Sequence, residues 1–425
     1  MNINNKFFNK LSLNIFVFII ALFMHYRVFE VVGYMYTINY HHENINSLIS
    51  IVGLLILTYI SLEDNEILEI FSSILILGIY MPVAVVISKI DFNLIYLFFT
   101  FLSVATITIT MKFFSKFLSK LMVRNYNYFK LTFSSLHNAT FSIFLLIIVY
   151  LFFKRNGNFN FDLISTYYNA YAMRADVGDS DLFNYFYGWC LLVAFPMFYS
   201  CSGTKFRYLF IFFILLSSIL IFQLEATKIT LLSSILILFF SILYRFNKHI
   251  RFSNSPQYFF VVLFLFCYFS GSIAYPLLDR FFYLTGLNSL FYFDFFSTHT
   301  YYYFHGEKLD FGISDYDIGL GYLIDNQYYG GGGTNQSAGF MPSAYANLGV
   351  FGLILQSIFL GLIVAWIATL QDRAHKFTYL VCIALGFLLM NFAFFQLFLS
   401  AGLIFIILIP LIIRDEKFNK GRILG

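Results

Sequence analysis

Long apolar runs recur from one end of this 425-residue chain to the other, and they constrain its fold more than any other feature. The hydrocarbon core of a bilayer requires about 20 mostly apolar residues in each helix that crosses it, with a range of roughly 17–25. The sequence therefore predicts an all-α polytopic integral membrane protein with about 12 transmembrane helices in a single membrane-embedded domain, residues 1–425. The predicted spans are residues 12–33, 46–62, 67–88, 92–111, 136–153, 182–200, 208–224, 229–244, 257–278, 345–369, 377–395 and 397–413.

Composition excludes the soluble classes of protein. Hydrophobic residues make up 60% of the chain and charged residues only 11%, whereas a soluble domain has about 25% charged residues. So few charged side chains could not cover the surface of a protein folded in water. A soluble enzyme, a nucleic-acid-binding module and a disordered chain are therefore excluded. The abundance of Phe, Tyr, Ile, Asn and Lys, which have AT-rich codons, indicates a bacterial genome of low GC content.

The distribution of Lys and Arg predicts which side of the membrane each connection faces. When the N-terminus is placed inside, most of the 26 basic residues fall in cytoplasmic segments, including Lys6, Lys10 and Lys112. Cytoplasmic loops of membrane proteins carry this excess of positive charge. We therefore expect a multi-pass protein of the bacterial inner membrane with both termini in the cytoplasm.

A minority of the basic residues fall on the predicted periplasmic side, against this bias. Arg174, Lys228 and Arg280 lie at or near outer ends of predicted helices, where either a functional role or a solvated helix end explains them. Arg27 has Glu30 three residues further along the first span, and mutual pairing is a sufficient explanation. Solvated loop charge is the simpler explanation for the others, which are Lys89, Lys154, Arg155 and Lys308.

Two outer connections are much longer than the rest: a periplasmic loop of residues 154–181 and a large periplasmic loop of residues 279–345. A structureless loop as long as the second is unusual, so we expect it to be functional and to contain helices. Its first part, Phe281–Tyr303, predicts a helix lying at the membrane interface. The Gly330–Gly333 run predicts a flexible, lid-like segment. Large outer loops over many helices favour an enzyme acting on a lipid-linked substrate over a transporter.

Two short segments resemble a known family. Gly339–Gly352 reads G-F-M-P-S-A-Y-A-N-L-G-V-F-G, and Glu225–Thr230 reads E-A-T-K-I-T. Both are similar to O-antigen polymerases, the Wzy-type oligosaccharide repeat-unit polymerases of bacterial surface polysaccharide assembly. The predicted layout of twelve spans with enlarged third and fifth outer loops also resembles that family along almost the whole chain. The sequence departs from it in lacking the Arg-x10-Gly pattern of some members, since thirteen residues separate Arg174 from Gly188.

The resemblance implies a specific reaction. Such a polymerase is a membrane glycosyltransferase that takes a glycan linked to undecaprenyl pyrophosphate. It joins the reducing end of that glycan to the non-reducing end of another lipid-linked repeat unit, and undecaprenyl pyrophosphate leaves. The resemblance further implies that no cofactor, metal or nucleotide sugar is needed. The implied partners are the lipid-linked oligosaccharides, membrane lipids and a regulator of chain length, with no nucleic acid.

The departing pyrophosphate develops negative charge, which Arg or Lys side chains at the membrane surface would stabilise. Arg174, Lys228 and Arg280 are the candidate pyrophosphate-binding residues, and they come from three separate outer connections. Asp315 and Asp317 have the spacing of an Asp-x-Asp metal site, but a solvated loop explains them equally well. We therefore predict no metal site.

The acceptor hydroxyl must lose a proton, so a general base within hydrogen-bond reach of it is expected. The candidates are His305, His299 and Glu225, and histidine is suited because its unperturbed pKa is about 6.5. Each has a simpler alternative. A loop histidine is often only solvated, and Glu225 has Lys228 three residues further on as an ion-pair partner. Further carboxylates in the long loop are Asp294 and Glu307.

Two other functions stay open. An O-antigen ligase shares this layout but transfers finished chains to the lipid A core, and neither His299 nor His305 begins the His-(Asn/Ser)…Gly-Thr pattern expected there. A lipid-linked oligosaccharide flippase is also often twelve-spanning. A flippase should place cationic residues in a central cavity at the membrane midplane, whereas the basic residues here gather at outer helix ends.

Overall fold

The computed structural model describes residues 3–32, 44–63, 65–125, 189–201, 228–244, 252–271, 274–304, 316–331 and 339–412, with Gln336 and single positions between 141 and 219. The chain divides into two compact units. The first comprises Met1–Lys116, Ile250–Ala365 and Gly386–Gln396, and the second Phe117–His249, Trp366–Leu385 and Leu397–Gly425. Throughout the described ranges the elements are helical, with no strand among them.

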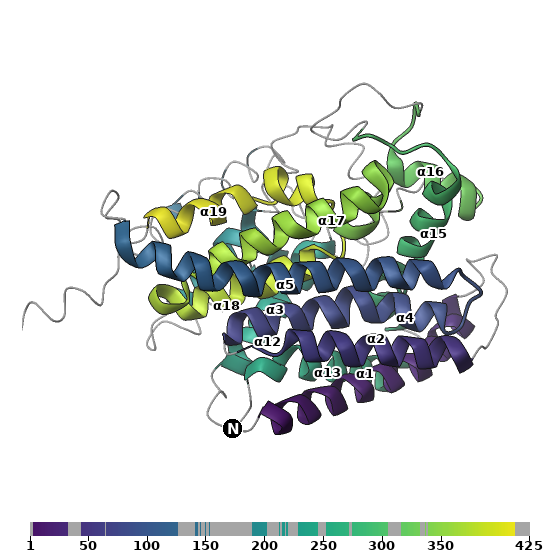
Figure 1. Ribbon diagram of the computed structural model, residues 1–425, viewed down its shortest axis with the longest axis horizontal. Helices are drawn as coiled ribbons and strands as arrows, with labels where there is room; N and C mark the ends of the chain where they lie inside the picture. Colours follow the sequence, from purple (N-terminus) through teal and green to yellow (C-terminus); the bar gives the residue numbers. More distant parts are fainter. Residues whose placement is uncertain are drawn as a thin grey trace, which may run out of the picture. The chain divides into compact units, whose positions relative to one another are not determined.

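The first half of the first unit is built from antiparallel helices. They are α1 (Ile3–Val32), α2 (Asn44–Ser61), α3 (Glu66–Leu75), the π-helical turn η2 (Ile76–Tyr80), α4 (Met81–Ile87) and α5 (Leu94–Asn125). Figure 1 shows α1, α2 and the continuous α3–α4 helix lying side by side. The Asn65 side chain begins α3 by accepting hydrogen bonds from the backbone amides of Ile67 and Leu68, at 3.0 and 3.3 Å.

The second half of this unit adds helices from much later in the chain. They are α13 (Ser255–Ser270), α14 (Tyr275–Leu278), the π-helical turn η7 (Asp279–Tyr283), α15 (Leu284–Thr298), α16 (Leu320–Tyr328) and α17 (Phe340–Ala368). α13 and α14 pack against α1, and α15 packs against α4. The C-terminal end of α17 belongs to the second unit.

The second unit contains shorter described elements. They are η3 (Cys190–Ala194), α10 (Phe195–Cys201), α12 (Lys228–Leu243), most of α18 (Gln371–Leu388) and of the π-helical turn η8 (Gln396–Ser400), and α19 (Leu403–Ile412). The Trp366 indole donates a 2.8 Å hydrogen bond to the carbonyl of Ile407. The Tyr244 hydroxyl lies 3.1 Å from Nδ1 of His375, so this unit is also joined by polar contacts between helices distant in sequence.

Four described helices are long and apolar enough to cross a membrane: Asn4–Glu30, Glu66–Ile87, Leu94–Leu118 and Phe340–Ala368. They coincide with the first, third, fourth and tenth spans of the sequence prediction. Shorter apolar helices lie over four further predicted spans, at Ile45–Ser61, Ser234–Leu243, Ser255–Ser270 and Ala374–Leu388. The predicted spans 136–153 and 208–224 lie mostly outside the described residues, so the total of twelve stays a prediction.

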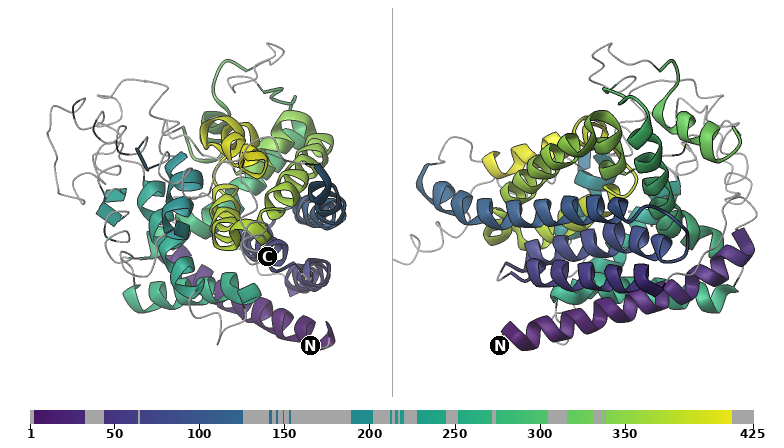
Figure 2. Two further views of the ribbon diagram at one scale, coloured as in Figure 1. Left: turned by 90° about the vertical axis from the view of Figure 1, so that its left-hand side faces the viewer. Right: turned by 45° about the vertical axis from the view of Figure 1, so that its right-hand side comes forward.

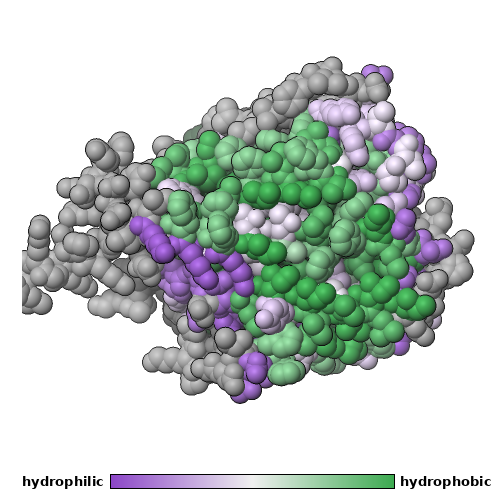
Figure 3. Space-filling view, in the orientation of Figure 1, coloured by the Kyte–Doolittle hydropathy of each residue, from purple (hydrophilic) through white to green (hydrophobic). Residues whose placement is uncertain are grey.

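The outward-facing side chains support membrane insertion. Phe16 and Phe23 of α1 and Leu48 and Val52 of α2 are each more than half exposed. Figure 3 shows hydrophobic side chains covering most of the described surface on one face. Soluble monomers rarely expose contiguous apolar patches of more than a few hundred Å². The described residues therefore form an all-helical protein whose surface suits lipid.

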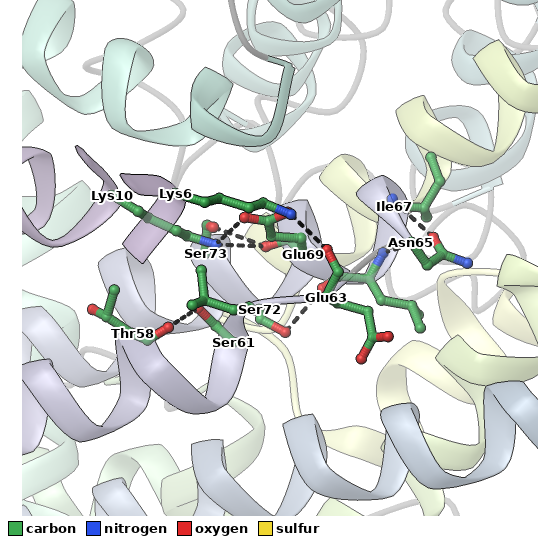
Figure 4. Close-up of polar contacts among 12 residues, drawn as sticks. Lys6, Lys10, Thr58, Ser61, Glu63, Asn65, Ile67, Glu69, Ser72 and Ser73 are labelled. Atoms are coloured by element: carbon green, nitrogen blue, oxygen red, sulfur yellow. Dashed lines mark hydrogen bonds and ion pairs between the residues drawn. The ribbon is translucent and has the colours of Figure 1, made fainter. Parts of the chain in front are cut away.

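Charged residues meet at one end of the first unit. Glu69 of α3 is fully buried and pairs with Lys10 at 3.2 Å and with Lys6 at 2.7 Å, both from the start of α1 (Figure 4). Glu63 pairs with Lys112 of α5 at 3.6 Å. These three lysines are among those that the orientation prediction assigns to the cytoplasmic side. At the opposite end of α1, Arg27 and Glu30 form the expected exposed pair, at 3.8 Å.

α15 lies where a helix is expected, but its environment differs from the prediction of an interfacial helix. A helix lying at an interface exposes one polar face, whereas residues Gly286–Phe293 of α15 are buried on all sides. The close contact begins at Gly286, where a Cβ atom would lie 2.6 Å from the carbonyl carbon of Pro82. Glycine therefore lets the backbones of α15 and α4 approach, and the aromatic side chains of α15 fill the core of the unit.

Candidate active site

The first described part of the predicted outer loop, residues 279–304, leads from α14 into α15 and ends beside the beginning of α17. α16 lies beside α15, as labelled at the right of Figure 1 and seen at the upper right of the right-hand view in Figure 2. Between them and the start of α5 is a group of polar and aromatic side chains within the first unit. We call Tyr96, Asn288, Asp294, Tyr328 and Tyr329 the carboxylate–tyrosine cluster.

Asp294 is the half-buried centre of this cluster. The Tyr96 hydroxyl donates a 3.0 Å hydrogen bond to Oδ1, and the Tyr328 hydroxyl donates a 2.7 Å hydrogen bond to Oδ2. The ring of Tyr328 also stacks on that of Phe291, with centroids 4.3 Å apart and planes 12° apart. Within the described ranges Asp294 has no ion-pair partner, so phenol hydroxyls take the place of a counter-ion.

Tyr329, which directly follows α16, also connects this helix to α15. The Tyr329 hydroxyl donates a 2.6 Å hydrogen bond to Oδ1 of Asn288. Burial raises the pKa of both Tyr328 and Tyr329, and the neighbouring carboxylates of Asp294 and Asp279, respectively, raise it further. Both phenols therefore stay protonated and act as hydrogen-bond donors over the whole physiological pH range.

The segment after α16 is held by its own polar contacts. The Gln336 side chain donates a 3.1 Å hydrogen bond to Oδ1 of Asp325, and the Tyr292 hydroxyl donates a 2.8 Å bond to the Gln336 carbonyl. Gly330 and Gly331 have positive φ angles of 79° and 74°, a conformation that glycine adopts without strain. The described part of the predicted lid-like segment thus turns sharply at the glycine run.

His299 follows α15 and is exposed. Its Nδ1 lies 2.8 Å from the carbonyl oxygen of Phe295, and its ring stacks on that of Phe295 at 4.1 Å with planes 1° apart. A carbonyl only accepts hydrogen bonds, so this contact requires the proton on Nδ1. In the neutral ring the Nε2 lone pair then has no partner among the described residues, which is the arrangement that a general base needs.

The extended segment after His299 is fixed by the residues that resemble the polymerase family. The backbone amide of Tyr302 donates a 2.8 Å hydrogen bond to the Ala346 carbonyl, and that of Phe304 donates a 2.6 Å bond to Oδ1 of Asn347. Tyr303 and Phe304 have positive φ angles of 49° and 64°, which are costly for aromatic residues. Buried Asn347 compensates for this strain by satisfying the Phe304 amide.

Gly349 of α17 lies in the same family-like motif as Asn347. Both its backbone conformation and its close contact favour glycine. Its φ is +60°, and α17 is interrupted there by non-helical angles at Leu348 and Gly349. A Cβ atom at this position would overlap the hydroxyl of Tyr301. The family-like motif therefore forms a kinked helix. This helix holds the aromatic segment 301–304, which follows His299.

The structure describes only part of the predicted site. Arg280 is exposed on η7 and forms no ion pair with any described residue. Lys228 is the first residue of α12, but its side chain is outside the described part. The other predicted site residues, Arg174, Glu225 and His305, lie outside the described residues. The expected convergence of the three cations, and the alternative Glu225–Lys228 pair, therefore stay predictions.

A small pocket lies between α15, α17 and the end of α18. It is lined by side chains and backbone that include Ser289, Pro342 and Met390, and its volume of about 10 Å³ suits one water molecule at most. It is too small for a sugar. In the described ranges, no three His, Cys, Asp or Glu side chains gather closely enough to hold a metal ion together.

Sequence reasoning ranked Asp294 below the histidines and did not single out Tyr96, Tyr328 or Asn288. A signal for Asp294 was present, because an acidic residue inside the aromatic run Phe291–Phe296 needs a polar partner. Its partners come from residues 198 and 34 positions away, and a single sequence gives no indication of such contacts.

The fold and the exposed apolar surface define an all-helical membrane protein with a polar–aromatic cluster and an accessible histidine in the first unit. No described protein family, no curated protein and no solved structure matches this chain. The argument for function therefore depends on the residues of the site itself.

Proposed function

We propose that this protein is a membrane glycosyltransferase that polymerises undecaprenyl-pyrophosphate-linked oligosaccharide repeat units. The product is O-antigen, as in lipopolysaccharide biosynthesis, or a related surface polysaccharide. The reaction takes place at the outer face of the bacterial inner membrane, in a protein with twelve spans and both termini in the cytoplasm. The resemblance of Gly339–Gly352 to O-antigen polymerases favours this reaction over other reactions of lipid-linked glycans.

The environment of His299 carries the proposal. Its Nδ1 is engaged by the Phe295 carbonyl at 2.8 Å, and Nε2, at an exposed position, has no partner in the described part of the chain. The Thr298 hydroxyl also lies 2.9 Å from Nδ1, and the ring stacks on that of Phe295. A fixed, accessible base in the long outer segment is what glycosyl transfer to a sugar hydroxyl requires.

In the proposed reaction, His299 accepts the proton of the acceptor hydroxyl at Nε2 while the acceptor oxygen attacks the anomeric carbon of the donor glycan. A carbon–oxygen bond forms at that carbon, and its bond to the pyrophosphate oxygen breaks. Undecaprenyl pyrophosphate leaves with the electron pair. Glu225 and His305 are the alternative bases.

The departing pyrophosphate needs positive charge, and exposed Arg280 is the described candidate for supplying it. An Arg guanidinium binds two phosphate oxygens at once, which stabilises the charge that develops on the leaving group. Arg174 and Lys228 are proposed as the other two cations. In this proposal the protein acts on lipid-linked oligosaccharides within membrane lipids, together with a regulator of chain length.

The rival functions differ in the product that accumulates when the protein is absent. A strain lacking a polymerase displays single repeat units attached to the surface lipid. A strain lacking a ligase retains long lipid-linked polymer that is not attached to the core. A strain lacking a flippase accumulates single repeat units that face the cytoplasm.

A gel of surface polysaccharide from a deletion strain therefore tests the proposal. We expect the ladder of chain lengths to collapse to the single-repeat species and to return when the wild-type chain is expressed again. Unattached long polymer would instead identify a ligase. Loss of every surface repeat unit, with inward-facing single units, would identify a flippase.

A further inference from the structure

We propose that Asp294 and Phe291 form a binding site for one sugar ring of the glycan substrate, and that Tyr328 of α16 occupies this site when no substrate is bound. This inference rests on the proposed function, because it specifies where that enzyme holds its carbohydrate. It also identifies α16 (Leu320–Tyr328) as the element that moves when the glycan enters.

The contacts of Tyr328 are those that a sugar makes with a protein. Its hydroxyl donates to Oδ2 of Asp294 at 2.7 Å, and its ring lies flat on Phe291 at 4.3 Å. A pyranose ring is similar in size to a phenol ring. It presents hydroxyl donors at its edge and C–H groups on its faces, and C–H groups are attracted to the negative face of an aromatic ring.

The environment of Asp294 is unusual for a carboxylate whose role is only structural. A half-buried carboxylate is normally stabilised by a cation, yet its described partners are the uncharged phenols of Tyr96 and Tyr328. Hydrogen bonds from hydroxyl groups to a carboxylate are stronger than those between neutral groups. When Tyr328 leaves, Oδ2 of Asp294 can accept a sugar hydroxyl in its place, while Tyr96 continues to donate to Oδ1.

For α16 to leave this position, the Tyr329–Asn288 and Gln336–Asp325 hydrogen bonds must break together with that of Tyr328, and glycines flank the helix on both sides. The helix is nine residues long, follows Gly319 and is followed by Gly330 and Gly331, both with positive φ. A Cβ atom at Gly330 would meet no atom within 4 Å, and the Gly331 amide donates a 3.2 Å hydrogen bond to the Asp325 carbonyl that closes the last turn of α16. Short segments with glycine at both ends are suited to act as hinged covers over active sites.

Binding of a defined probe to the full-length chain tests the inference. The probe is the oligosaccharide repeat unit released by mild acid from the host strain's own polysaccharide, titrated into protein in lipid nanodiscs. We expect Asp294→Asn to weaken binding at least about tenfold, because it removes the charge that strengthens the hydrogen bonds. We expect Tyr328→Phe to tighten binding by about threefold to tenfold, because the competing hydroxyl is removed.

Tyr322→Phe is the matched control, since Tyr322 lies on the same helix, is exposed, and its hydroxyl forms no hydrogen bond with the described residues. Its affinity should equal that of the wild type. Unchanged binding by Asp294→Asn, weaker binding by Tyr328→Phe, or no binding of the probe by the wild type would each overturn the inference. If Asp294→Asn fails to fold, as judged by gel filtration, the Tyr328→Phe result decides.

The outcomes also separate this inference from the proposed function. If the deletion strain keeps its ladder while Asp294→Asn loses the probe, the polymerase proposal fails and the sugar site stands. If the ladder collapses on deletion and Asp294→Asn restores it with unchanged probe binding, the polymerase stands and the sugar site fails.

Discussion

Glu69 is a buried charged residue whose carboxylate is neutralised by lysines of another helix. The carboxylate is fully buried on α3 and accepts from Lys10, whose side chain is 1% exposed, and it also pairs with the partly exposed Lys6. Removing one member of a buried ion pair leaves an uncompensated charge, which costs more than the pair itself contributes. Glu69 and Lys10 therefore act as one unit.

A double-mutant cycle at this pair has a definite expected result. Glu69→Leu alone should lower the free energy of unfolding by about 3–5 kcal/mol, because the Lys10 ammonium is left without an anion. Adding Lys10→Met should recover most of that loss, since neither charge then remains. Denaturant titration in detergent micelles measures both changes.

The exposed Arg27–Glu30 pair is the control for this cycle. Glu30→Leu should change the free energy of unfolding by less than about 1 kcal/mol, as exposed ion pairs contribute little. A double variant at Lys10 and Glu69 that is no more stable than Glu69→Leu would contradict the account of the buried pair.

Asn347 is expected to stabilise the aromatic segment 301–304, which follows His299. Asn347→Ala removes the acceptor of the Phe304 amide and leaves that buried donor unsatisfied, at a cost of about 1–3 kcal/mol. Thermal unfolding in micelles should therefore show a lower midpoint for Asn347→Ala. Asn326→Ala, at an exposed position of α16, should leave the midpoint unchanged, and equal midpoints for the two variants would contradict this role.

Residue types could be predicted better than residue partners. The sequence indicated His299 as a base because histidine titrates near neutral pH, and it indicated Arg280 because its charge opposes the orientation bias. It could not indicate that Phe295 fixes the tautomer of His299, or that Tyr96 reaches Asp294 from α5. These contacts depend on how distant helices pack, and local patterns do not encode packing.

At the scale of elements, the contact of α15 with α4 depends on a missing side chain. Gly286 lies against the backbone of Pro82 and Val83, within 2.6 to 3.0 Å of where a Cβ atom would be. A methyl group there must push the two helices apart, because backbone atoms cannot move aside as a flexible side chain can. α15 carries Asp294 and is followed directly by His299, so its position matters for the site.

Gly286→Ala should therefore destabilise the protein by about 1–3 kcal/mol, the usual cost of overpacking a core. Gly319→Ala is the matched control, because its Cβ would meet only the Tyr322 side chain at ordinary contact distances. Midpoints of thermal unfolding in micelles compare the two variants. A Gly286→Ala protein as stable as Gly319→Ala would show that the α4–α15 contact is looser than described.

Apolar runs predicted the positions of the described helices well, because length and hydropathy alone decide whether a segment can cross a bilayer. The burial of α15 was not predicted. Its aromatic residues with scattered polar groups suit either an interfacial helix or a buried one, and only the packing of α4 and α16 distinguishes them. The contact of Gly349 with Tyr301 was not predicted for the same reason, since it depends on packing between distant segments.

At the scale of the whole molecule, the proposed function depends on which side of the membrane each segment faces. Lys6, Lys10 and Lys112 lie together at one end of the first unit, and the orientation bias assigns them to the cytoplasm. The segment of residues 305–315 is predicted to face the periplasm. An active site for a translocated lipid-linked glycan requires this arrangement.

Epitope tags test this predicted orientation directly. Tags at the two termini should resist protease added to intact spheroplasts, and a tag inserted within residues 305–315 should be cleaved. Permeabilising the membrane should make the terminal tags cleavable, which controls for tags that are merely hidden. Cleavage of either terminal tag in intact spheroplasts would contradict the predicted orientation.

The most direct test of the account is the polysaccharide ladder of the deletion strain expressing His299→Ala. We expect a fall in polymer of at least about a hundredfold, with only the single-repeat species left, because general bases contribute 10²–10⁴-fold to such reactions. Asp317→Asn, an exposed change in the same loop, should restore the full ladder. A full ladder from His299→Ala at an equal amount of protein would contradict the central claim that this histidine is the base of a glycan polymerase.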